Sequence, residues 1–313
     1  MYACQERTSA QAQQYLIEIA KVMDDIYNNT TMKELPLHIE QHVTVDSNQD
    51  SALDLLANVT GLSKTQVKLA MNKGAVWLTR RRQTSRLRRA KKGLRLGDVL
   101  HLYYDKEILN EEPALPVMVA DNTAYSVWYK PYGARSQGSK WGDHCTVHRW
   151  VEQNLKPQRP AFVVHRLDRA ATGLILIAHQ KRMATALSQL FEARDIEKIY
   201  QVIVHGRFPN TSEPVILNTE IDDRDALSLA SLQGYSAEQD RSLVEVKIET
   251  GRKHQIRIHL SELGFPVVGD RLYGHEGDRE DLQLAACSLA FCCPVSGEKV
   301  EFELPEKWKP KLA

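Results

Sequence analysis

Apolar and polar positions alternate in short segments along the second half of the chain. Segments such as "AYSVWYK", "YQVIV" and "SLVEVKIET" are brief and are separated by turn-forming residues. A period of two with frequent turns predicts strands of an antiparallel or mixed sheet. Helical spacing is confined to residues 145–154, 181–193 and 253–263. No regular strand-helix alternation and no G-x-G-x-x-G loop occur, which argues against a dinucleotide-binding fold. The pattern predicts an α+β domain over residues 121–313.

The first half of the chain follows a different pattern. Residues 9–27 space their apolar side chains helically and predict one amphipathic helix, whereas residues 28–50 are polar and turn-rich and indicate a connector. Residues 51–104 predict a compact unit. It has two short helices that end at Gly61 and Gly74, a strand "AVWL", a basic loop and a strand within "LRLGDVLHLYY".

Length and composition agree with two domains in a chain of 313 residues. Residues 105–120, with two prolines and four acids, predict a linker, so the expected parts are 1–50, 51–104, 105–120 and 121–313. No apolar run approaches the roughly 18 residues of a membrane span, and the N-terminus lacks the pattern of a secretory signal. Five scattered cysteines predict neither a disulfide framework nor a metal site and indicate the cytoplasm.

The net charge of +1 hides a strong local asymmetry. Residues 64–95 contain twelve Lys or Arg and no Asp or Glu. Such a segment is typical of a surface that binds a polyanion, because the partner responds to the local field rather than to the net charge. The alternative is a solvated basic face. Patterned apolar residues between the basic ones favour a folded, binding surface.

Polar groups crowd four stretches of the larger domain. In one of them, "VVHRLDRAATGLILIAHQ", Asp168 stands between two arginines just before a wholly apolar strand. Alone, this is equally consistent with a surface ion-pair cluster. In another, "EKIYQVIVHG", alternation turns the ring of Tyr200 inward. Lys130 and Pro131 are expected to shape a turn. The four stretches are residues 128–138, 163–180, 197–206 and 250–274.

Together these stretches resemble the RluA-type pseudouridine synthases. H-R-L-D-R-x-x-x-G, K-x-Y, T-G-R-x-H-Q-I-R-x-H and G-D-x-x-Y-G all match, as does the closing "LAFCCPVSGEKVEFELP", so the resemblance spans nearly all of residues 121–313. Residues 51–104 resemble the small α-L RNA-binding module that often accompanies this catalytic domain. Two positions depart from the family pattern. Ala52 stands where the module often has Arg, and Ala171 replaces a hydroxyl residue of T-S-G.

The resemblance implies a fold and a set of roles. It implies a mixed, mostly antiparallel sheet with a central RNA cleft. Asp168 would be the nucleophile or base, Arg257 its ionic partner, and Tyr200 would lie against the target base. Arg166 would reach the RNA where the base is extruded, and Ile256 would line the uracil pocket. Substrate-binding roles are also expected for His165, Arg252 and Gln255. The predicted RNA-binding residues of the module are Lys64, Lys68, Arg80, Arg81, Arg82, Arg86, Arg88 and Arg89.

The implied reaction explains these residue types. It breaks the bond from uracil N1 to ribose C1′ and rejoins the base through C5. No redox change or external atom is involved, so we expect no cofactor and no metal. Burial would raise the pKa of Asp168, and a nearby arginine opposes this, typically by about 1–3 units. The carboxylate could attack C1′, add to the pyrimidine ring, or remove a proton from C2′.

Two rival functions and several open questions accompany this interpretation. The first rival is a non-catalytic RNA-binding or ribosome-assembly factor that keeps the fold. The second is a glycosidase-like hydrolase, which would usually need two carboxylates flanking the bond.

We expect RNA as the partner, with ribosomal RNA favoured over transfer RNA. We expect no membrane association, no nucleotide cofactor, and a monomer. The specific uridine is not encoded in any recognisable motif.

Overall fold

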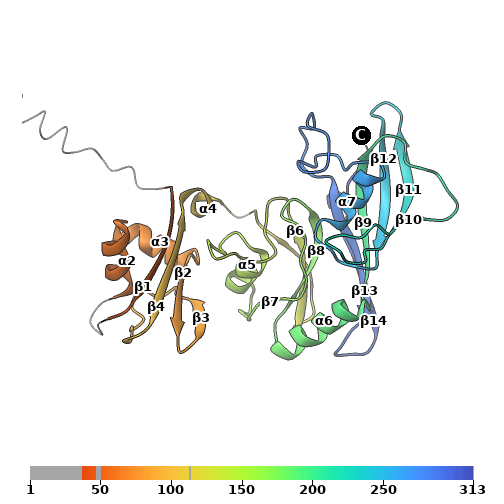
Figure 1. Cartoon of the computed structure of the whole chain (residues 1–313). Coiled ribbons are helices and arrows are strands. Elements are labelled where there is room, and N and C mark those ends of the chain that lie inside the picture. Colours follow the sequence, from red (N-terminus) through yellow and green to blue (C-terminus); the bar gives the residue numbers. More distant parts are fainter. Residues whose placement is uncertain (1–36, 47–50, 113, 313) are drawn as a thin grey trace, which may run out of the picture.

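The computed structural model describes residues 37–46, 51–112 and 114–312, which form a small lobe and a larger lobe side by side (Figure 1). The predicted helix at 9–27 lies outside the described residues. Helix α5 (Val147–Asn154) lies between the two lobes in this view. Among the described residues, no helix is long and apolar enough to cross a membrane.

The small lobe is a four-stranded antiparallel sheet in the order β1-β4-β2-β3, covered on one face by two helices. The predicted helices are confirmed: Ser51 caps the first through its side chain, and Gly61 ends it in the left-handed conformation. Ser63 and Gln66 form a capping box on the second. The elements are β1 (His38–Thr44), α2 (Ala52–Thr60), α3 (Lys64–Asn72), β2 (Val76–Arg80), β3 (Gln83–Arg86) and β4 (Val99–Asp105).

Two strands of the small lobe lie where the sequence predicts none. β1 falls in the expected connector, residues 28–50, and β3 falls in the expected basic loop. Both are polar edge strands, so the alternation of apolar and polar residues in their sequences is weak. They form because β1 pairs with β4 and β3 pairs with β2. Arg81 and Arg82 form the two-residue turn between β2 and β3, with φ of 48° and 68°. Such turns usually take Gly or Asn, so this hairpin presents two arginines from backbone positions that disfavour them.

The predicted linker, residues 105–120, is largely structured. It contains a short helix, α4 (Lys106–Asn110), and most of β5 (Val117–Asp121), which pairs with β6 (Tyr125–Lys130) of the large sheet. Prolines and acids mark irregular chain between elements, but they do not reveal a strand that only pairing stabilises. The larger domain therefore begins at β5.

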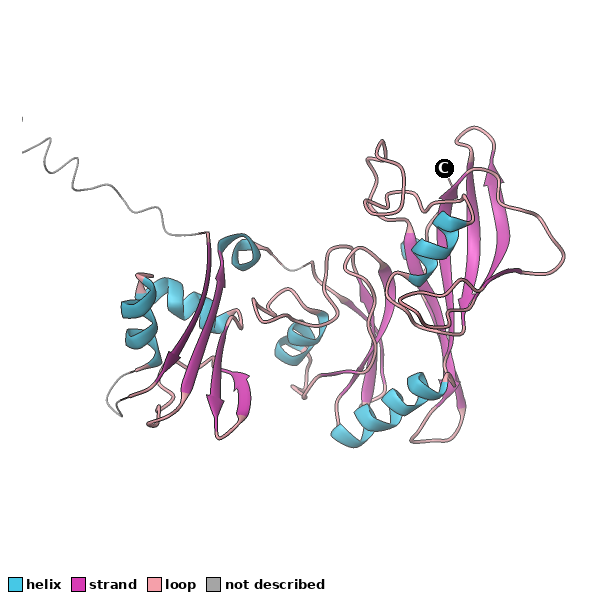
Figure 2. Ribbon diagram, in the orientation of Figure 1, coloured by secondary structure: helices cyan, strands magenta, loops and turns pink. Residues whose placement is uncertain are grey.

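The larger lobe is a ten-stranded sheet with the path β10-β11-β12-β9-β13-β8-β6-β5, in which β7 pairs with β8 and β14 with β13. Among the described strand pairs, β13 with β8 is parallel and the rest are antiparallel, as expected. The helices lie against this sheet (Figure 2). The remaining elements are β7 (Phe162–Val163), β8 (Thr172–Ala178), α6 (Lys181–Ala193), β9 (Glu197–His205), β10 (Val215–Leu217), β11 (Ser228–Ser236), β12 (Arg241–Ile248), α7 (Gln255–Glu262), β13 (Leu284–Cys292), β14 (Lys299–Glu303) and the 3₁₀ helix Glu306–Trp308.

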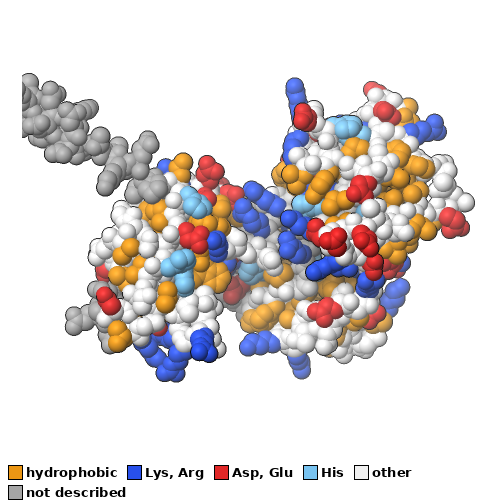
Figure 3. Space-filling model, in the orientation of Figure 1, with side chains coloured by type: hydrophobic (Ala, Val, Ile, Leu, Met, Phe, Trp, Pro, Cys, Tyr) orange, Lys and Arg blue, Asp and Glu red, His pale blue; other side chains and the backbone are white. Residues whose placement is uncertain are grey.

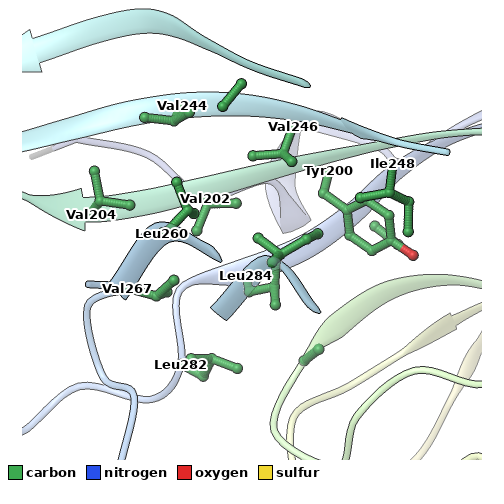
Figure 4. Close-up of a cluster of buried hydrophobic side chains, with 14 of the residues drawn as sticks. Tyr200, Val202, Val204, Val244, Val246, Ile248, Leu260, Val267, Leu282 and Leu284 are labelled. Carbon is green, nitrogen blue, oxygen red and sulfur yellow. The ribbon is translucent and has the colours of Figure 1, made fainter. Parts of the chain in front are cut away.

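One apolar cluster lies beneath α7 and supports the region in which the conspicuous stretches meet. The predicted inward face of β9 is confirmed: Tyr200, Val202 and Val204 are buried against β12 and α7. Figure 4 shows Tyr200 at the end of this cluster with its hydroxyl directed away from the valines. The cluster therefore holds an aromatic ring at its edge, where a cavity begins.

Gly173 occupies the contact between β8 and β13. Its φ is +108°, and a Cβ atom there would lie 2.3 Å from the carbonyl oxygen of Ala286. We predict that Gly173→Ala lowers the free energy of unfolding by about 3 kcal/mol or more, from backbone strain and overpacking. Urea unfolding measures this. Gly277→Ala, where a Cβ would meet nothing within 4 Å, should change stability by less than about 0.5 kcal/mol; equal effects would contradict the prediction.

Candidate active site

A loop between β7 and β8 carries Asp168. The following strand is buried from Gly173 to Ala178, so the loop is seated on a rigid element. Ser136, from a neighbouring turn, fixes the backbone of Leu167: its Oγ accepts from the Leu167 N–H at 2.9 Å and donates to the Leu167 carbonyl at 2.8 Å. The Asp168 side chain thus projects from a fixed position, and about 20% of it is exposed.

The turn after β6 is bound to the same loop through Lys130. This side chain is completely buried, and its ammonium donates to the carbonyls of Pro131 (3.2 Å), Ala134 (2.8 Å) and Arg169 (3.1 Å). Burial lowers the pKa of Lys130 to about 7, although the charge of Asp168 opposes the shift. The expectation that Lys130 shapes a turn is confirmed.

Arg257 of α7 bridges two carboxylates. Its Nε and Nη2 each donate to Asp270 at 2.7 Å, while its Nη1 lies 3.4 Å from Oδ2 of Asp168. The Arg257 side chain is 6% exposed and that of Asp270 is fully buried. The expected pairing of Arg257 with Asp168 is present, but the shorter bonds go to Asp270. The second carboxylate orients the guanidinium, whose remaining nitrogen faces Asp168.

Asp270 is a site residue to which the sequence pattern assigns no role. Burial alone would raise the pKa of this carboxyl. Hydrogen bonds from Arg257 and from the backbone N–H groups of Leu272 and Tyr273 outweigh burial and lower the pKa. For Arg257, burial opposes the charged form, yet the hydrogen bonds and charge of Asp270 and the charge of Asp168 raise the pKa. The G-D-x-x-Y-G stretch is the only sequence signal that could have identified Asp270.

A cavity of about 220 Å³ opens beside Asp168. At ~30 Å³ per water molecule it would hold about seven waters, which is enough space for a uracil ring. The structure brings most of the predicted catalytic and substrate-binding residues together around it. Lining residues are Arg166, Leu167, Asp168, Ala171, Tyr200, Ile248, Gly251, Arg252, Lys253, His254, Gln255, Ile256, Arg257 and Leu284.

Two rings flank the Asp168 carboxylate. Tyr200 is 9% exposed, and burial together with the nearby charge of Asp168 raises the pKa of its hydroxyl. The ring of His254 has its Nε2 3.9 Å from Oδ2 of Asp168 and its Nδ1 3.0 Å from the hydroxyl of Tyr273. His254 has φ of +57°, a conformation uncommon for a residue other than glycine. Burial lowers the pKa of His254, and the charge of Asp168 opposes that shift.

Two predicted substrate-binding residues have structural partners instead. His165 is absent from the cavity lining: its Nε2 accepts from the N–H of Leu176 in β8 at 2.8 Å, and its ring stacks on Phe191 at 4.4 Å. The prediction for His165 is therefore corrected; its ring attaches the loop to the strand. Gln255 lines the cavity but uses its amide to build the preceding turn, accepting from the Thr250 hydroxyl at 2.7 Å.

The basic residues of the small lobe divide into two groups. Arg86 and Arg88 both pair with Asp143, a buried residue of the larger domain, so they join the two lobes. Arg80 pairs with Asp98 at 2.6 Å, and Lys64 with Asp54 at 2.5 Å. Within the described part of the chain, four of the predicted RNA-binding residues make no ion pair and are exposed: Lys68, Arg81, Arg82 and Arg89.

Comparison with known proteins identifies the larger domain. Residues 124–262 match the family model described as RNA pseudouridylate synthase. Over these residues the larger domain is similar to this family. The small lobe lies outside the matched residues, so its α-L resemblance stays a prediction.

Individual relatives agree with this assignment. An uncharacterized RNA pseudouridine synthase of Chloroflexus aurantiacus is 40% identical over 158 residues, which cover 46% of this chain and 49% of that protein. The ribosomal large subunit pseudouridine synthase C of Buchnera aphidicola is 27% identical over 67% of this chain and 71% of its own length. The chain spans about half the length of the curated relatives that it matches at 30% identity or more.

A solved structure supports the fold. Human RNA pseudouridylate synthase domain containing 1 superposes with a TM-score of 0.52 and 23% identity, covering 64% of this chain and 88% of that one. At this identity the likeness bears on the fold alone. It confirms the expected α+β architecture of the larger domain.

Breaking the buried pair should cost stability. We predict that Asp270→Asn lowers the free energy of unfolding by about 3 kcal/mol at neutral pH, because it leaves the buried Arg257 charge poorly compensated. Chemical denaturation measures the loss. Asp281→Asn, an exposed carboxylate nearby, is the matched control, and a loss no larger than that of the control would refute the pairing.

Acid should weaken the attachment made by His165. Burial, with a smaller effect of Lys198, lowers its pKa from 6.5 to about 3. The unfolded chain therefore takes up the proton first, and stability is lost as the pH falls from about 6.5 towards 3, by about 2 kcal/mol at pH 5. His165→Gln does not titrate, so its free energy of unfolding should fall less than that of the wild type between pH 7 and pH 5. Parallel urea-unfolding results for the two proteins would contradict this.

Proposed function

We propose that this protein isomerises uridines in RNA to pseudouridine, with Asp168 as the reacting carboxylate. The observation that carries the proposal is the Asp168–Arg257–Asp270 arrangement beside a uracil-sized cavity, in a domain of the RNA pseudouridylate synthase family. Binding alone would not require a carboxylate at the mouth of a cleft meant for phosphate, since like charges repel.

Each neighbour of Asp168 has a physical task in this proposal. Arg257 stabilises the charged carboxylate from within the protein, and Asp270 keeps the guanidinium from turning away. The N1–C1′ bond breaks, the base turns within the cavity, and a C5–C1′ bond forms while the C5 proton leaves and N1 gains one. Tyr200 closes one wall and keeps the detached base in place. Asp168 contributes by one of three routes: attack at C1′, addition to the pyrimidine ring, or removal of the C2′ proton.

The target uridine must first leave its stack. This costs a few kcal/mol and least in loops and single strands, where proteins usually read RNA sequence. Arg166 is exposed at the cavity rim. We propose that it fills the position that the uridine vacates, while Arg81, Arg82 and Arg89 of the small lobe bind phosphates.

We further propose large-subunit ribosomal RNA as the substrate, ahead of transfer RNA. Two observations support this choice: the name of the Buchnera relative and the exposed basic residues of the small lobe. Because the reaction involves no redox change and no external group, we propose that it proceeds without a cofactor. The free thiols of Cys145, Cys287, Cys292 and Cys293 fit a reducing cytoplasm, and we propose a monomer.

A tritium-release assay tests the function. RNA transcribed with tritium at uracil C5 should lose label to water with the wild-type protein, and Asp168→Asn should lower the rate by a factor on the order of 10⁴ or more. Asp281→Asn serves as the charge-matched control and should retain the rate. RNA binding by Asp168→Asn should persist.

The outcomes separate the rivals. No label release by the wild type on either ribosomal or transfer RNA favours the non-catalytic binding factor. Free uracil among the products favours the hydrolase.

A further inference from the structure

A second hollow adjoins the Asp168 carboxylate. Its volume is about 380 Å³, and it shares Asp168, His254 and Arg257 with the uracil-sized cavity. Its other walls include Tyr132 from the turn after β6 and Leu272 from the loop after α7. The two hollows therefore adjoin each other at one carboxylate.

Apolar groups are exposed in this hollow. Tyr132 is 39% exposed and Leu272 is 67% exposed. Single exposed apolar residues are ordinary on protein surfaces. These two come from separate loops, line the same hollow and lie next to the reacting group, and such exposed apolar surface at a site is typical of ligand binding.

Both loops are fixed relative to Asp168. On the Tyr132 side, the N–H of Gly133 donates to the Arg169 carbonyl at 3.0 Å, and the ammonium of Lys130 donates to the same carbonyl. On the other side, the N–H of Leu272 donates to Asp270 at 2.9 Å. The hydrogen-bonded framework around Asp168 and Asp270 therefore also positions the backbone from which the two apolar side chains project.

Arginines outnumber carboxylates around the hollow, which is lined by Arg169, Arg257 and Arg271 together with Asp168 and Asp270. The Arg169 side chain lines it and is 59% exposed, with one ion pair to Glu111 at 3.2 Å. A third hollow shares Tyr132 and continues to the exposed Lys307. In the space-filling view, Lys and Arg side chains gather where the surface is hollowed between the lobes (Figure 3). The chemistry combines stacking surfaces with cations, as single-stranded RNA sites do.

We propose that the second hollow is a subsite for the nucleotide next to the target uridine, whose base stacks between Tyr132 and Leu272 and whose phosphate pairs with Arg169. This inference rests on the proposed function and assigns a place to the flanking nucleotide. Stacking of this kind is tolerant of base identity, because every base has a π face. The subsite would hold the strand while the uridine is turned into its cavity.

A binding experiment without turnover tests the subsite. The probe is a short fluorescent single-stranded RNA with one uridine among cytidines, bound to Asp168→Asn protein and followed by anisotropy. Tyr132→Ala in that background should weaken binding about tenfold, since a stacked base contributes about 1–3 kcal/mol and 1.4 kcal/mol is a factor of ten. Tyr132→Phe should restore it. Leu272→Ala should weaken binding several-fold, and Ile216→Ala, an exposed apolar residue on β10, should not.

A second probe isolates the stacking. The same RNA with an abasic nucleotide beside the uridine, placed on one side and then on the other, should bind Tyr132→Ala and the tyrosine-containing protein equally at one of the two positions. The subsite is overturned if Tyr132→Ala weakens binding of the intact RNA and of both abasic RNAs by the same factor. It is also overturned if Tyr132→Ala binds the intact RNA as tightly as the tyrosine-containing protein does.

A kinetic arm separates this inference from the function. With tritium release, Tyr132→Ala should raise KM more than it lowers kcat, and thermal melting should show that the exposed substitution leaves the fold intact. Label release by the wild type together with an unchanged KM for Tyr132→Ala defeats the subsite and leaves the function standing. Absence of any release by the wild type defeats the function, and the binding arm alone then decides the subsite.

Discussion

The rest of the site depends on one buried guanidinium held between two carboxylates. Arg257 gives its two shortest bonds, at 2.7 Å, to Asp270 and faces Asp168 across 3.4 Å with its remaining nitrogen. A buried charge without a partner is costly, and Asp270, which accepts both short bonds, is the partner that offsets this cost. The contact from Arg257 to Asp168 is longer than its bonds to Asp270, and in the proposed function this leaves the Asp168 carboxylate free to approach a substrate.

Arg257 lies on α7 and Tyr200 on β9, whereas Asp168 lies on a loop that buried polar contacts make rigid. Ser136 secures Leu167 beside the aspartate, and His165 is attached to β8 through the N–H of Leu176. Lys130 joins the turn after β6 to the carbonyl of Arg169. Catalytic geometry must hold within fractions of an ångström, and hydrogen bonds to the backbone provide that precision where no helix or strand does.

The contact between the lobes changes the meaning of the basic segment. Asp143 is 4% exposed, and its carboxylate forms ion pairs with Arg86 and Arg88. These two arginines therefore fix the small lobe to the larger domain, while Arg81 and Arg82 stay exposed at the tip of a hairpin. A count of basic residues along the chain cannot distinguish the paired arginines from the exposed ones. The pairing depends on Asp143, which lies 55 residues after Arg88 in the sequence.

The sequence alone determined the α+β class, the helices of both lobes other than α4, and the inward face of β9, because periodicity encodes them. The motifs of the family resemblance gave half of the residues that line the uracil-sized cavity. It did not reveal β1, β3 or β5, whose polar or edge positions form strands only through pairing. Only the tertiary structure placed Asp270 behind Arg257, moved His165 out of the cavity and set Tyr132 beside Asp168. These are contacts between segments that are distant in the sequence. A local sequence pattern does not specify which distant side chain will pair with a buried charge.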